Sequence, residues 1–187
     1  MVLNLELIGV GIKPIFTITV PKMKKPINAL FDTGSTKVIW CSAKTDIKEL
    51  VFRDTHKTTT LSGFGTGKQE GCRIYEGSFG IYRAGRGIIF RDIEIVESTK
   101  KMEAFDLLLP YALFHEFEYT FKPASPDAKF GRLVVDTLSD RLVYGVKSYG
   151  GVVAEVYADE EDMDFDDTWL LGKGTNLLQN CQELSSF

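Results

Sequence analysis

The residues best suited to chemistry lie in one short stretch, Asp32-Thr33-Gly34-Ser35. Apolar, β-prone residues flank this stretch on both sides, so the sequence predicts a tight turn between two buried strands. Such a turn would hold the Asp32 carboxylate partly withdrawn from water, beside two hydroxyl groups, where it could act as an acid or a base. An Asx turn, in which Asp and Gly serve only the backbone conformation, accounts for the tetrapeptide equally well.

A second stretch of interest is rich in glycine and lies between two strand-like runs. Its central residues are Gly63, Phe64, Gly65, Thr66 and Gly67. Glycines at this density predict a hairpin tip that can approach a bound peptide backbone closely. Phosphate binding is the competing interpretation, but a phosphate-binding loop needs Gly at the position of Ser62 and Ser or Thr at the position of Gln69.

A third stretch, residues 105–110, reads Phe-Asp-Leu-Leu-Leu-Pro and is typical of a short buried strand. In this order, the three stretches resemble aspartic peptidases over roughly residues 14–122. The first resembles the Asp-Thr-Gly-Ser active-site loop, which is followed by an apolar strand and Trp40. The second resembles the flap, although Phe64 replaces the usual Tyr and removes its hydrogen bond to the Trp. The third resembles the buried strand that passes the active loop, but Pro110 stands where that family has Gly.

Only one such loop is present, because Asp136-Thr137 is not followed by glycine. The resemblance therefore points to the retropepsins, in which two chains each supply one loop to a homodimer. Two carboxylates at hydrogen-bond distance share one proton, and Asp32 with its dimer mate would activate a water molecule between them. The resemblance also implies that Thr33 bonds across the axis, that Gly34 permits backbone approach, and that Ser35 donates to the Asp32 carboxylate.

The expected activity is hydrolysis of peptide or protein substrates at mildly acidic pH. Residues 63–67 would bind the substrate as the flap. No cofactor, metal or covalent intermediate is expected. Two alternatives stay open: a non-catalytic β-barrel binding or assembly module of the same fold, and half of a heterodimeric peptidase.

The whole chain predicts a mainly β fold, namely a closed, barrel-like aspartic peptidase lobe with one or two short helices. Residues 1–154 hold 21 basic and 17 acidic side chains, whereas residues 155–187 hold one basic and nine acidic ones. This asymmetry predicts a peptidase domain over 1–154 and an acidic segment over 155–187 with an interface or regulatory role, or partial disorder. The spacing of Asp162, Asp164 and Asp166 suggests a calcium loop, but the required Gly and Glu are absent.

Composition excludes several classes of protein. A net charge of −4 argues against nucleic acid as a partner, and no apolar run is long enough to predict a membrane span. Three widely spaced cysteines predict no disulfide framework, so we expect a cytoplasmic protein. His56 and His115 have no neighbours at metal-ligand spacing, and Cys41 is expected to be a buried core thiol.

Overall fold

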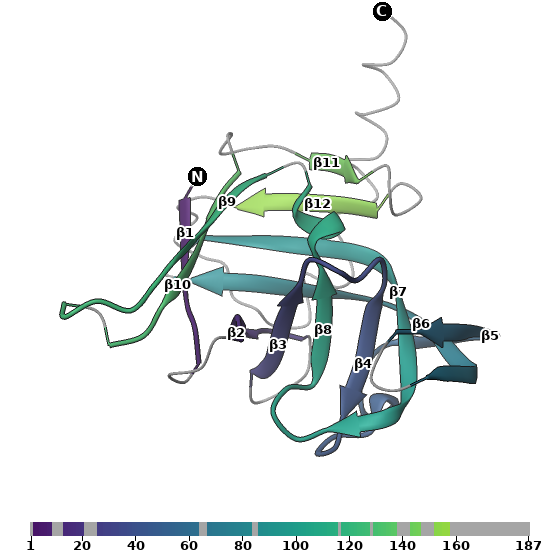
Figure 1. Ribbon diagram of the computed structural model, residues 1–187. Coiled ribbons are helices and arrows are strands. Elements are labelled where there is room, and N and C mark those ends of the chain that lie inside the picture. Colours follow the sequence, from purple (N-terminus) through teal and green to yellow (C-terminus); the bar gives the residue numbers. More distant parts are fainter. Residues whose placement is uncertain are drawn as a thin grey trace, which may run out of the picture.

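Strands dominate the computed structural model of this 187-residue chain (Figure 1). The structure describes residues 2–8, 13–20, 26–63, 67–83, 86–115, 117–127, 129–137, 143–146 and 152–157. The strands are β1 (Val2–Glu6), β2 (Ile15–Ile18), β3 (Ile27–Asp32), β4 (Val38–Ser42), β5 (Arg53–Ser62), β6 (Lys68–Arg83), β7 (Arg86–Met102), β8 (Leu107–Pro110), β9 (Glu118–Lys122), β10 (Arg132–Asp136), β11 (Val143–Val146) and β12 (Val152–Tyr157). Two single-turn 3-10 helices, η1 (Ile47–Glu49) and η2 (Tyr111–Phe114), complete the described elements. The mainly β prediction is therefore confirmed.

Local patterns account for the hairpins. Strands β2 and β3 pair in antiparallel register, with Ile15 opposite Leu30 and Ile18 opposite Ile27. Strands β9 and β10 also pair as an antiparallel hairpin. The expected short helices are the single turns η1 and η2, and η1 is capped because the Asp46 side chain accepts from the Lys48 N–H at 2.9 Å.

The predicted closed barrel is wrong, because neither sheet closes among the described strands. One sheet has the order β1-β10-β9, and the other runs β11-β12-β7-β4-β8-β3-β2, with β6 pairing β7 and β5 pairing β6. Strand β2 is only four residues long, and beyond it Thr19 and Gly80 exchange one pair of backbone hydrogen bonds. This isolated bridge is too short to form the ladder that would close a barrel.

Two apolar clusters fill the interior. The larger lies between the two sheets and is built around aromatic side chains that are fully buried: Phe16, Trp40, Phe79, Phe90 and Phe114. The smaller contains Ile15, Ile39, Cys41, Leu108 and their neighbours. Because alternate residues of a strand point to opposite faces, β3, β4 and β8 supply side chains to both clusters.

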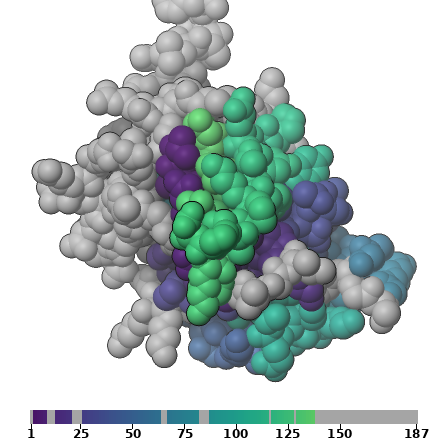
Figure 2. Space-filling model, turned by 60° about the vertical axis from the view of Figure 1, so that its left-hand side comes forward, coloured from purple at the N-terminus to yellow at the C-terminus, as the bar shows by residue number. Residues whose placement is uncertain are grey.

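One face of the molecule carries the three-stranded sheet. In Figure 2, the purple N-terminal strand β1 lies beside the green residues of β10, its antiparallel partner. No helix within the described residues has the length and apolar character needed to cross a membrane. Strand β12 runs through the proposed boundary at residues 154/155, and residues 158–187 lie outside the described part of the chain.

Candidate active site

The Asp32 turn crosses the end of a third strand. Strands β3 and β4 are joined by residues 33–37, yet they do not pair with each other, because β8 lies between them (Figure 1). Strand β8 is parallel to β3, with Pro110 in register with Asp32, and antiparallel to β4, with Leu108 opposite Ile39. Proline at position 110 is thus compatible with the pairing that the sequence predicted for this stretch.

A buried carboxylate ties these three strands together at the other end of β8. Asp106 is 8% exposed and accepts from the Asn28 N–H at 3.0 Å and from the Ser42 hydroxyl at 2.5 Å. Its backbone N–H donates to Asn28 O at 2.8 Å, and its carbonyl accepts from the Cys41 N–H at 2.9 Å. The segment that leads into β8 is therefore hydrogen-bonded to both flanking strands, which holds β8 in place between them.

Cys41 is not a nucleophile in this arrangement. Burial of its thiol, reinforced by the nearby negative charge of Asp106, raises the pKa of Cys41 to about 12, although Lys101 acts in the opposite direction. The thiolate is the reactive form of cysteine, so this side chain is inert near neutral pH. The expectation of a buried core thiol is confirmed.

Local hydrogen bonds stabilise the turn itself, and the Lys37 N–H donates one of them to Ser35 Oγ at 3.3 Å. The Gly34 N–H donates to Asp32 Oδ1 at 2.8 Å, and a Cβ at position 34 would lie 3.3 Å from the same oxygen. The Ser35 hydroxyl donates to Lys37 O at 2.9 Å. The expected bond from Ser35 to the Asp32 carboxylate is therefore wrong for this chain, because the hydroxyl closes its own turn toward β4 instead. The Gly34 N–H, rather than the Ser35 hydroxyl, donates to the Asp32 carboxylate.

Asp32 opens into a groove of about 330 Å³. Its apolar lining comes from separate elements: Leu30 of β3, Ile39 of β4, Met102 of β7, Phe105 and Leu108. Its polar lining consists of Lys13, Asp32, Gly34, Ser35, Ser62 and Gly63. Asp32 is the only Asp or Glu among the described residues that line this groove.

The glycine-rich hairpin reaches the groove through its base. Ser62 pairs with Lys68 where β5 meets β6, and Gly63 and Gly67 have positive φ angles of 84° and 97°. Gly63 lines the groove with Asp32, Gly34 and Ser35, whereas Gly67 and the exposed Thr33 are not among its lining residues. The expected flap residues Phe64, Gly65 and Thr66 lie outside the described residues.

Gln69 anchors this hairpin to β7, which the sequence did not indicate. Its Oε1 accepts from the Ser98 hydroxyl at 2.9 Å, from Thr99 N–H at 3.0 Å and from Thr99 Oγ1 at 2.9 Å. Met102, which lines the groove, ends the same strand. Sequence reasoning also missed Lys13 and Met102 as lining residues of this groove.

Trp40 is fully buried on the opposite face of the same strands. Its ring meets that of Phe52 edge to face, with centroids 6.5 Å apart, and Phe52 in turn covers Gly77. Its Nε1 has no hydrogen-bond partner among the described residues. Phe64, which the sequence analysis placed opposite this Trp in the flap, lies outside the described residues.

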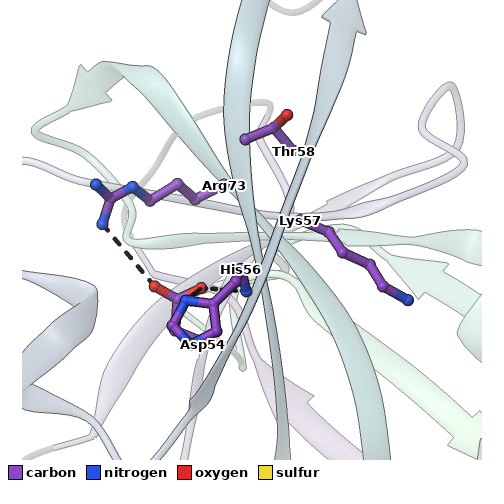
Figure 3. Close-up of a pocket in the computed structure, with 5 residues that line it drawn as sticks. All are labelled: Asp54, His56, Lys57, Thr58 and Arg73. Carbon is purple, nitrogen blue, oxygen red and sulfur yellow. Dashed lines mark hydrogen bonds and ion pairs between the residues drawn. The ribbon is translucent and has the colours of Figure 1, made fainter.

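A second pocket of about 210 Å³ lies on the β5–β6 hairpin (Figure 3). Asp54 accepts from the His56 N–H at 2.7 Å and lies 3.9 Å from Arg73 Nη1, while Lys57 extends away from it. The His56 φ angle is 58°, at a bulge where the strand register shifts. Within the described residues no group of three His, Cys, Asp or Glu could hold a metal ion. These exposed ion pairs form no site comparable to the Asp32 groove.

No known family and no curated protein matches the sequence. Among solved structures, the chain is similar to a retropepsin-like aspartic protease from Rickettsia conorii, with 15% sequence identity and a TM-score of 0.43. That similarity covers 73% of this chain and 90% of the other.

Proposed function

We propose that this protein is an aspartic endopeptidase of the retropepsin type, active as a homodimer. The observation that carries the proposal is the position of Asp32. It ends β3, and its turn opens into a groove that is partly lined by apolar side chains and that Ser62 and Gly63 also line. An extended peptide fits such a groove because its backbone can pair with neighbouring backbone while its side chains enter apolar subsites.

The dimer follows from the need for two carboxylates. Asp32 is the only carboxylate among the described lining residues, and the second Asp-Thr pair belongs to β10 of the other sheet, with Asp136 opposite Val2 and Glu118. Thr33 and Gly34 are exposed on the turn. A two-fold axis beside this exposed turn would bring in a second copy of Asp32.

In the proposed reaction, the ionised member of the pair takes a proton from the water whose oxygen attacks the peptide carbonyl carbon. The protonated member gives its proton to the carbonyl oxygen, which yields a neutral tetrahedral diol. When the diol breaks down, its C–N bond is cleaved and the departing nitrogen takes a proton from the carboxylate pair. A hydroxyl proton of the diol passes to the pair, which is thereby returned to its starting state. Water is consumed, and no covalent enzyme intermediate forms.

The test combines cleavage with assembly. Wild-type protein should form dimers in sedimentation experiments and cleave peptides from a mixed library, whereas Asp32→Asn should reduce kcat at least about a thousandfold while the protein stays folded. The matched control is Asp127→Asn, because Asp127 lies in the exposed turn between β9 and β10. It should leave cleavage unchanged.

Mixing the two forms separates the alternatives. If each site needs Asp32 from two chains, excess Asp32→Asn chains will lower the activity per wild-type chain in proportion to the wild-type fraction. Activity that is insensitive to this mixing would refute the shared site. A dimer without cleavage would support a non-catalytic module, and an inactive monomer that gains activity only with another protein would support half of a heterodimeric peptidase.

A further inference from the structure

We infer that Lys13 makes the groove selective for substrates with an acidic side chain beside the scissile bond. This inference rests on the proposed peptidase function and specifies its substrate class. The substrate would be an extended peptide that carries apolar side chains and one Asp or Glu, placed where the Lys13 ammonium can reach it.

Lys13 lies just before β2, the hairpin partner of the strand that ends at Asp32. Ile15 lies opposite Leu30, and the Phe31 N–H donates to Pro14 O at 3.0 Å. The chain turns at Pro14, because the Ile15 N–H donates to Lys13 O at 2.9 Å. Lys13 and Asp32 both line the groove, so a peptide bound there would lie against both side chains.

The surroundings of Lys13 make its charge important for binding. Lys13 and Asp32 are the only charged side chains among the described lining residues, and five of the others are apolar. A catalytic pair that shares one proton keeps a single negative charge, which repels an acidic substrate unless a cation lies near. Lys13 supplies that cation in the groove into which Asp32 opens.

A second lysine near Asp32, Lys37, does not supply positive charge to the groove. Lys37 follows the Asp32 turn, but its Nζ lies 3.5 Å from Glu94 Oε1, and it is not among the groove-lining residues. Its charge is therefore directed to the β7 surface. An acidic substrate side chain in the groove would meet Lys13 as its cationic partner, and a Lys or Arg at that place would be repelled.

The experiment uses pairs of peptides that differ only by Glu or Gln at one position, scanned across three residues on each side of the cleaved bond. For one position the wild-type enzyme should show about fivefold higher kcat/KM for Glu, the size of a single partly exposed ion pair. Lys13→Ala should abolish this ratio, and Lys13→Glu should reverse it in favour of Gln. The matched control is Lys48→Glu, because Lys48 is exposed on η1 and is not among the lining residues.

A binding measurement separates this inference from the proposed function. Dissociation constants for the same labelled peptides are measured with Asp32→Asn protein, with and without Lys13→Glu. If wild type cleaves no peptide, the proposed function fails, while a Glu preference in binding that depends on Lys13 still supports the inference. Three results would overturn the inference: no Glu preference at any position, a preference that survives in Lys13→Glu, or an equal loss for Glu and Gln peptides in Lys13→Ala.

Discussion

Replacing Asp106 tests whether its hydrogen bonds hold β8 between β3 and β4. Its two carboxylate oxygens accept from Asn28 N–H and from the Ser42 hydroxyl, and that hydroxyl is oriented because it accepts from Lys44 N–H at 3.1 Å and Thr45 N–H at 3.0 Å. Hydrogen bonds to a charged acceptor contribute about 1.5–3 kcal/mol each. Asp106→Ala should therefore lower the free energy of unfolding by about 3–5 kcal/mol, a large fraction of the roughly 5–15 kcal/mol of a typical domain.

Asp106→Asn separates the two bonds. The amide oxygen can still accept from Ser42, but the amide NH₂ then faces the Asn28 N–H, so one bond is lost and two donors oppose each other. We expect a loss of about 1–3 kcal/mol, between wild type and Asp106→Ala. Both variants should also lower peptide cleavage, because β8 no longer holds the Asp32 turn in one position.

The assay is urea unfolding followed by Trp fluorescence, with kcat and KM measured on the same samples. Asp127→Ala is the matched control, since it removes an exposed carboxylate and should change stability by less than about 0.5 kcal/mol. The reasoning would be refuted if Asp106→Ala changed the free energy of unfolding by less than about 0.5 kcal/mol. It would also be refuted if the variant differed from wild type in its m value but not in its denaturation midpoint. A third refuting result would be Asp106→Asn being less stable than Asp106→Ala.

Two further predictions concern the interior. Gly77→Ala should destabilise the protein by about 2 kcal/mol or more in urea unfolding, because the added Cβ would overlap the Phe52 ring, with Cε1 at 2.7 Å and Cγ at 2.9 Å; a second change, Phe52→Leu, should recover part of the loss, and full additivity would argue against the clash. Cys41 should resist alkylation in the native state at pH 8, since raising the thiol pKa from 9.0 to about 12 lowers its thiolate fraction about a thousandfold. Peptide mapping by mass spectrometry checks this, and labelling of Cys41 as fast as in urea would contradict it.

Much of the local structure could be predicted because it depends on neighbours in the chain. Alternating apolar residues set the strand period in β2 and β3, and the Asp32 turn follows from Asp and Gly two positions apart. The apolar run after Phe105 predicted a buried strand, and β8 is fully buried. In each case the relevant interactions span only a few residues, so the pattern is sufficient.

Tertiary structure alone decided what surrounds Asp32. The insertion of β8 between β3 and β4 joins residues about 75 positions apart, and Met102 enters the groove only because β7 pairs with β4. Sheet order decided that the sheet stays open, since closure needs a ladder that the four residues of β2 do not provide. The Ser35 hydroxyl donates to Lys37 O, an acceptor that the sequence analysis did not identify. Such choices depend on register and packing between distant segments, which no local pattern of residue types encodes.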